Sequence, residues 1–148
     1  MKLATVGYEK ETQALVIGKL KDAGVELVID VRAVAASRRA GFSKTLLSAS
    51  LNEAGIGYVH LRQLGTPKAG RDAARKGHIA EMHEIFHAHM VEPGAQLELA
   101  KATEFARGKK VALLCYEADA AGCHRTILAN WICEDLSAEP GGCEIENL

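Results

Sequence analysis

Residues 111–131, VALLCYEADAAGCHRTILANW, pass from an apolar run through a polar loop into a helical pattern. The run has the length and aliphatic content of a buried strand, and the segment after the loop has the periodicity of a helix. The stretch therefore predicts a strand–loop–helix unit. Its chemistry could be that of a reactive site, a metal site or two inert cysteines. Within eleven residues it carries two thiols, an imidazole and a guanidinium: Cys115, Cys123, His124 and Arg125.

The rest of the chain alternates strand and helix patterns. Strands are predicted over 2–8, 25–32, 57–64, 110–117 and, more weakly, 143–148. Helices are predicted over 10–24, 43–55, 78–107 with a break at 92–95, and 123–136. Strands that alternate with helices favour parallel βαβ units. We therefore predict a single α/β domain over residues 1–148, with three layers, a mostly parallel sheet of about five strands, and helices on both faces.

Length and composition are those of an ordinary soluble protein. The chain has 148 residues, of which 48% are hydrophobic and 25% charged, which suffices for one buried core. No apolar run approaches the roughly 20 residues of a membrane span, and the N-terminal segment lacks the apolar region of an export signal. We predict a cytoplasmic protein with no membrane partner. Its four cysteines, at 115, 123, 133 and 143, are expected to be reduced thiols, with no partner for Cys143.

Basic residues are concentrated in one part of the chain. Between Arg32 and Lys76 there are nine Lys and Arg residues and two acids, although the net charge of the whole chain is −1. This indicates either a local anion-binding surface or a solvated charged region. Within it, residues 62–78 are expected to form a loop, which as a flexible basic arm would contact nucleic-acid phosphates.

Polar residues follow the predicted strands at their carboxyl ends, the edge where open parallel sheets bind ligands. After the second strand, SRRAGFSK at 37–44 adds two guanidiniums, whose fork geometry suits phosphate or carboxylate. Pairing with acids elsewhere is the alternative for these arginines. Ser43 in this segment is expected to cap the following helix.

These motifs resemble those of the DUF488 family, small bacterial and archaeal proteins of unassigned function. The resemblance rests on TVGY at 5–8, IDVR at 29–32, SRRAGFSK at 37–44, YVHLRQLG at 58–65 and LLCYEADAAGCHR at 113–125. It covers nearly the whole chain, and it implies an α/β fold with a polar cluster at these motifs but no established reaction. Family members usually carry a proline where this chain has Ala40.

The start of the last long helix favours an anion or a thiolate, because free backbone N–H groups lie there. A strand that ends in a cysteine and is followed by a loop and an arginine resembles the phosphate loop of cysteine phosphatases. The stretch VIDVR also resembles a sequence of the rhodanese sulfurtransferases. The spacing differs, because nine residues separate Cys115 from Arg125 and phosphatase loops have five. A zinc site at the two thiols and His124 lacks an obvious fourth ligand, and packed, inert thiols are the remaining alternative.

A second metal pattern lies at 83–87, where HEIFH fits the H-E-x-x-H motif of zinc hydrolases. A convincing third ligand is missing, since His89 is too close in sequence. We expect these histidines to lie on a polar helix face, and we assign no metal.

The sequence therefore predicts an enzyme or ligand-processing domain whose partner is an anionic small molecule, such as a nucleotide, or a nucleic acid. The alternatives are a non-catalytic nucleic-acid-binding protein and a cysteine-based redox or metal-responsive protein. Cofactor, reaction and oligomeric state stay open. The residues predicted to act in catalysis are Cys115, Glu117 and Asp30. Those predicted to bind the ligand are Tyr8, Arg32, Arg38, Arg39, Cys123, His124 and Arg125.

Overall fold

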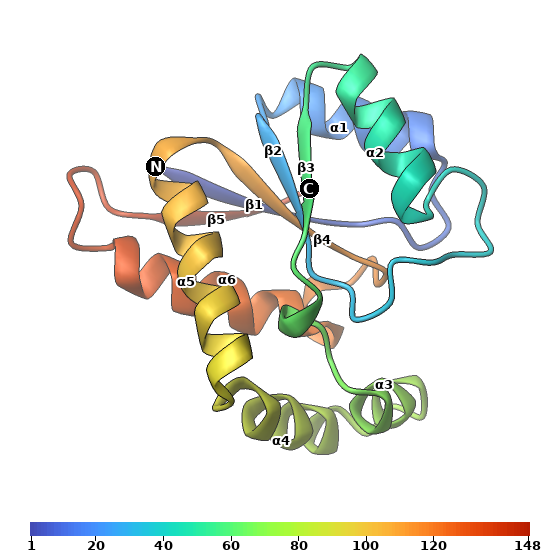
Figure 1. The fold of residues 1–148 in the computed structure, drawn as a ribbon, viewed down its shortest axis with the longest axis vertical. Coiled ribbons are helices and arrows are strands. Elements are labelled where there is room, and N and C mark those ends of the chain that lie inside the picture. The colour runs from blue at the N-terminus through green and yellow to red at the C-terminus, as the bar shows by residue number, and fades with distance from the viewer.

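Five parallel strands form the central sheet (Figure 1). The computed structural model describes residues 1–148, apart from the side chain of Ala121. The strands lie in the order β3, β2, β4, β1, β5, and each neighbouring pair is parallel. Their carboxyl ends therefore meet at one edge of the sheet. The strand bounds are β1 Lys2–Gly7, β2 Leu27–Asp30, β3 Gly57–His60, β4 Val111–Cys115 and β5 Glu144–Asn147.

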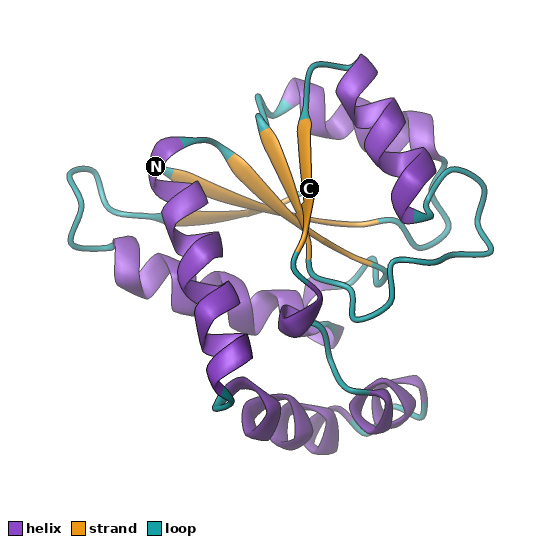
Figure 2. Ribbon diagram, viewed as in Figure 1, coloured by secondary structure: helices purple, strands orange, loops and turns teal.

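Helices cover both faces of the sheet (Figure 2), which confirms the predicted α/β class. On one face lie α1 (Gln13–Asp22) and α2 (Lys44–Glu53). On the other lie α5 (Pro93–Gly108) and α6 (His124–Leu136), with α3 (Lys68–Arg75) and α4 (Ile79–Met90) at one end of that layer. Two short 3-10 helices, Arg62–Leu64 and Ala120–Gly122, precede α3 and α6.

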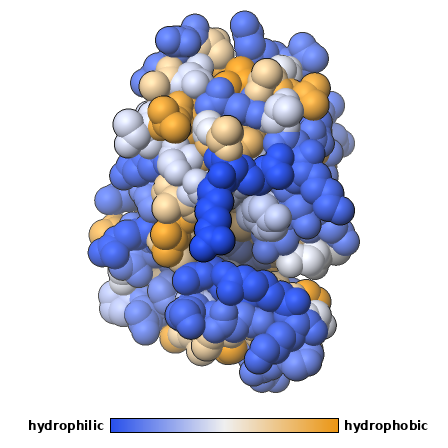
Figure 3. All heavy atoms as spheres, turned by 90° about the vertical axis from the view of Figure 1, so that its right-hand side faces the viewer, coloured by the Kyte–Doolittle hydropathy of each residue, from blue (hydrophilic) through white to orange (hydrophobic). Residues whose placement is uncertain are grey.

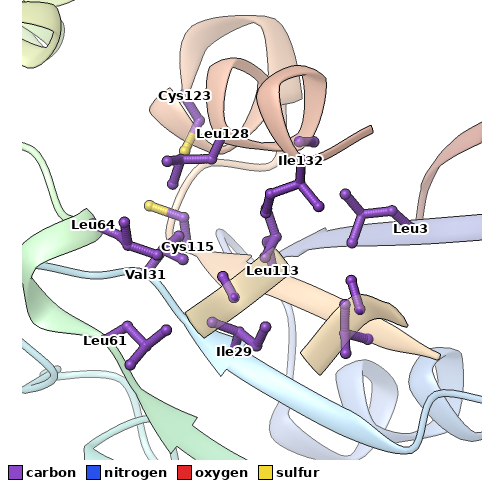
Figure 4. Close-up of a cluster of buried hydrophobic side chains, with 14 of the residues drawn as sticks. Leu3, Ile29, Val31, Leu61, Leu64, Leu113, Cys115, Cys123, Leu128 and Ile132 are labelled. Atoms are coloured by element: carbon purple, nitrogen blue, oxygen red, sulfur yellow. The ribbon is translucent and has the colours of Figure 1, made fainter. Parts of the chain in front are cut away.

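Adjacent residues of the central strands supply two separate hydrophobic cores. Val28 and Leu114 pack with the side chains of α1 and α2, whereas Ile29 and Leu113 pack with those of α5 and α6. Figure 4 shows Leu113 facing Ile132 of α6. Because successive strand side chains point to opposite faces, a strand covered on both sides is apolar along most of its length. This explains the apolar runs of β2 and β4, all of whose residues are buried. The polar exception is Asp30 at the end of β2, which is paired with Arg32.

Residues 68–75 form a helix, which corrects the prediction of a flexible loop over 62–78. The helix begins after Pro67 and packs against α4, with Gly70 and Ala73 buried. Its sequence gives little apolar periodicity, because small residues and not large aliphatic ones make the contact. Ser43 lies at the N-cap of α2 as predicted, but its hydroxyl is hydrogen-bonded to the backbone of Ser37 and not to the helix.

Cys133 and Cys143 form a disulfide, so the prediction of four reduced thiols is wrong for this pair. Their Cα atoms lie 5.2 Å apart, and the bond joins α6 to the residue before β5. Gly141 and Gly142, both with positive φ, turn the chain back between the two cysteines. Cys115 and Cys123 are free and buried. None of the helices in the described part of the chain combines the length and apolar character needed to cross a membrane.

Candidate functional site

A cavity of about 860 Å³ lies at the carboxyl edge of the sheet. Figure 3 faces this side of the molecule, where hydrophilic residues border a hollow. The predicted site residues Tyr8, Arg32, Cys115, Glu117 and His124 all line the cavity. The structure therefore brings these five predicted residues, which come from distant segments of the chain, together at this edge. The remaining lining residues are Glu9, Ala33, Val34, Ala36, Thr66, Arg71, Ala74, Arg75, Tyr116 and Gly122.

Arg32 is held by a buried ion pair at the back of the cavity. Its guanidinium contacts both carboxylate oxygens of Asp30, at 2.9 and 2.7 Å, and Asp30 is fully buried. The remaining Arg32 nitrogen donates to the hydroxyl of Tyr8 and to the carbonyl of Phe42. The hydroxyl of Tyr58 donates to Asp30. Although burial opposes the charge of Arg32, the Asp30 contacts raise the pKa of the guanidinium. Most donors of Arg32 are thus already used within the protein.

Cys115, Cys123 and His124 form a compact cluster, of which Cys115 and His124 line the cavity. Nδ1 of His124 lies 3.7 Å from Sγ of Cys115 and 3.6 Å from Sγ of Cys123. Nε2 of His124 lies 2.8 Å from the carbonyl oxygen of Val31, which can only accept a hydrogen bond. Nε2 therefore carries the proton, and in the neutral ring Nδ1 presents its lone pair to both sulfurs. Figure 4 shows the two sulfur atoms facing the same space between β4 and α6.

The cluster is electrostatically coupled. Burial disfavours the Cys123 thiolate, but the hydrogen bond from Cys115 and the charge of His124 outweigh it, so the pKa of Cys123 is well below its usual value. Burial likewise opposes the charge of His124, yet the charge of Cys123 raises its pKa. The hydrogen bond to Cys123, together with burial, raises the pKa of Cys115. Burial, with the charge of Cys123, also raises the pKa of Glu117.

Arg125 supports the loop above this cluster and does not line the cavity. Its guanidinium is almost fully buried and donates to the backbone carbonyls of Glu117 and Ala118. Gly7 makes room for the same loop, because a Cβ at this position would lie 1.8 Å from the carbonyl oxygen of Glu117. Tyr8 and Glu9 complete the attachment by donating their backbone N–H groups to the carbonyl of Tyr116.

Arg38 and Arg39 lie away from the cavity. Arg38 is exposed, and Arg39 lines a separate hollow of about 570 Å³ beside Glu11 and Gln13. Arg39 donates to the carbonyl of Glu11. The loop that carries both arginines thus runs along α1, and the structure does not bring them together with Arg32 in one site.

Two arginines of α3, Arg71 and Arg75, line the cavity, although the sequence analysis did not assign them to the site. Arg71 is half-buried and donates to the carbonyl of Thr66, and the exposed Arg75 pairs with Asp72. Their spacing of four residues, which places both on one side of a helix, is the signal that identifies them once residues 68–75 are recognised as helical. Glu9 and Glu117 line the same cavity and offset part of this positive charge.

The HEIFH histidines lie outside this site. Among the described residues, the cluster with metal-binding geometry consists of Cys115, Cys123 and His124. In the motif, the ring of His87 packs against Trp131. The neighbouring His89, which follows the motif, is hydrogen-bonded to the carbonyl of Gln63.

Fold and site together define an α/β protein with a ligand-sized cavity and a buried thiol–imidazole cluster at the carboxyl edge of a parallel sheet. The family model of "Domain of unknown function DUF488" matches residues 12–132, and the chain belongs to this family. The match contains all the quoted motifs except TVGY at 5–8, which precedes it. Comparisons with curated proteins and with solved structures found no significant match.

Proposed function

We propose that this protein binds a small phosphate-bearing ligand in the carboxyl-edge cavity and acts on it as an enzyme or ligand-processing domain. The observation that carries the proposal is that Arg71 and Arg75 of α3 line the cavity at the edge where parallel sheets bind ligands. Guanidinium groups favour phosphate because their planar N–H donors bind two oxygens at once.

The size of the cavity supports a small molecule as the ligand. Small-molecule sites measure about 300–1,000 Å³, and the volume of about 860 Å³ falls in this range. A nucleic-acid chain would instead need an extended basic groove. The basic residues of 62–78 that were predicted to form such an arm are partly used inward, since Arg71 is half-buried and bonded to Thr66.

The residues at the site have different roles in this proposal. Arg71 and Arg75 bind the anion, and Cys115 and Glu117 face it. Asp30 and Arg32 act as positioning residues, because their pairing fixes the back wall and the hydroxyl of Tyr8. Arg38, Arg39 and Arg125 are given no contact with the ligand.

Calorimetric titration with inorganic phosphate, pyrophosphate and AMP tests the proposal. We compare the wild type with the double variant Arg71→Gln/Arg75→Gln. The matched control is Lys68→Gln/Lys76→Gln, which removes the same charge at the first residue and the C-cap of the same helix, at residues that do not line the cavity. Binding is measured at low and at near-physiological salt, because nonspecific phosphate contacts weaken steeply with salt.

We expect the arginine variant to lose at least about tenfold in affinity for one of these probes, or about 1.4 kcal/mol. The lysine control should stay within about twofold of the wild type. The absence of binding by the wild type to all three probes would overturn the proposal. An equal loss in both variants would also overturn it, and would favour the nonspecific nucleic-acid-binding alternative.

A further inference from the structure

The cluster of Cys115, Cys123 and His124 has the composition and geometry of a metal site. Its two sulfurs and one imidazole nitrogen all lie within 4.8 Å of one another, and all three residues are buried. Thiolate and imidazole are the ligands that zinc prefers in proteins. We propose that these three residues bind one Zn²⁺ ion beside the cavity.

The distances fit a tetrahedral ion. Zn–S and Zn–N bonds are about 2.3 and 2.0–2.1 Å long, so two such ligands at tetrahedral angles lie about 3.6 Å apart. In this protein the two Sγ–Nδ1 distances are 3.7 and 3.6 Å. Two of the three ligand pairs are therefore already at the separation that a tetrahedral ion requires, and the third pair, the two Sγ atoms, lies within 4.8 Å.

The second shell favours the ligand form of His124. Metal-binding histidines usually donate their other ring N–H to a carbonyl or carboxylate, which fixes the tautomer and the ring orientation. Nε2 of His124 makes this contact with the carbonyl of Val31 at 2.8 Å. Phe86 packs against the imidazole at a centroid distance of 5.2 Å and restricts its rotation.

Charge balance also favours a divalent ion here. Binding displaces two protons from the cluster to solvent, which leaves two thiolates and a neutral imidazole as ligands. The ion and its three ligands then carry no net charge, which suits a buried position. Cys115 and His124 line the cavity, so a bound ion would be reached from it, and the Glu117 carboxyl group lies close by, with Oε2 3.4 Å from Sγ of Cys115.

The chain spacing gives this site no standard metal-binding motif, so the sequence supported zinc only as one of several alternatives. Cys115 ends β4, whereas Cys123 and His124 begin α6, so the ligands come from two elements and not from one tight Cys-x-x-Cys turn. Arg125 and Gly7 hold the intervening loop in place and thereby set the distance between the two thiols.

Zinc and cobalt binding to the metal-stripped protein, with Cys115 and Cys123 as free thiols and the Cys133–Cys143 disulfide intact, test the inference without any variant. We expect one Zn²⁺ per chain in competition with a chromophoric chelator. Co²⁺ should produce thiolate-to-metal charge-transfer absorption, and bound Zn²⁺ should protect Cys115 and Cys123 from iodoacetamide. Failure to bind Zn²⁺ at one ion per chain, or binding that leaves both thiols as reactive as before, would overturn the inference.

Variants then locate the ion. Cys123→Ser and His124→Ala should each lower Zn²⁺ affinity by at least about 100-fold, the upper end of losses seen for outer-shell partners. Circular dichroism checks their folding, and the wild-type measurements stand if either variant unfolds. His83→Ala/His87→Ala is the control for the HEIFH motif and should bind Zn²⁺ normally. If this control loses Zn²⁺, or if Cys123→Ser and His124→Ala both retain it, the inference is wrong.

The anion-binding proposal fails separately from this one. Arg71→Gln/Arg75→Gln should bind Zn²⁺ like the wild type, since neither arginine belongs to the cluster. Phosphate binding without Zn²⁺ binding would overturn only the metal site. Zn²⁺ binding without phosphate binding would overturn only the proposed function.

Discussion

Replacing Arg32 with methionine should destabilise the protein by about 3–5 kcal/mol, because it leaves a buried carboxylate without its partner. Asp30 is 0% exposed and Arg32 6%, so water cannot replace the two lost contacts of 2.9 and 2.7 Å. The hydroxyl of Tyr8 and the carbonyl of Phe42 lose a donor as well. For a chain of this length, each kcal/mol lowers Tm by about 2–4 °C. A fall in Tm of roughly 6–20 °C is therefore expected.

Urea unfolding followed by circular dichroism measures this loss. Arg38→Met is the matched control, because Arg38 is an exposed arginine of the same segment and should change stability by less than about 0.5 kcal/mol. In the double variant Asp30→Leu/Arg32→Met the charge and its partner leave together. Its loss should be smaller than the sum of the two single losses by at least about 1 kcal/mol. If Arg32→Met and Arg38→Met have equal free energies of unfolding, this reasoning is wrong. The Asp30–Arg32 pair then does not stabilise the site, and the guanidinium of Arg32 is available to bind a ligand.

Two further predictions concern the residues around this pair and the loop above the cluster. Gly7→Ala should destabilise the protein by about 1–3 kcal/mol, because the new Cβ would lie 1.8 Å from the carbonyl oxygen of Glu117. Gly18→Ala in α1, where nothing lies within 4 Å, should instead stabilise it by about 0.5–1 kcal/mol, and urea midpoints that are equal for the two variants would contradict this reasoning. Tyr58→Phe should lower stability at neutral pH by removing a donor to Asp30. Burial, together with the hydrogen bond to Asp30, raises the pKa of Tyr58 in the folded state. The stability that its neutral hydroxyl contributes is therefore fully present below the unfolded pKa of about 10 and is lost as pH rises above that value. The gap between wild type and Tyr58→Phe should therefore narrow above about pH 10, and a gap that widens there would refute the assignment.

Local patterns predicted most of the fold. β4 and β2 up to Ile29 are apolar runs because both faces of each strand are covered, and such runs can be recognised without knowledge of their neighbours. Glycines also marked the ends of helices, since Gly24 and Gly55 have the positive φ that other residues avoid. Helix α3 was missed because its buried side consists of small residues, Gly70 and Ala73, which give no hydrophobic periodicity.

The candidate site was predictable as a place but not as a set of contacts. A parallel sheet brings the residues at the carboxyl ends of β1, β2 and β4 to one edge, so the convergence of Tyr8, Arg32 and Cys115 follows from the order of elements. Three features are visible only in the tertiary structure. Arg32 is paired with Asp30, Arg125 is buried beneath the loop that follows β4, and Arg71 of α3 lines the cavity.

Periodicities within a few residues predict most of the elements, their parallel direction and the edge at which polar groups gather. Which side chains touch depends instead on the tertiary structure. His124 reaches the carbonyl of Val31 across 93 residues of chain, and Cys143 closes on Cys133 through a turn of two glycines. Whether a guanidinium or a thiol is free or paired depends on such distances between segments, which no local pattern of residues encodes.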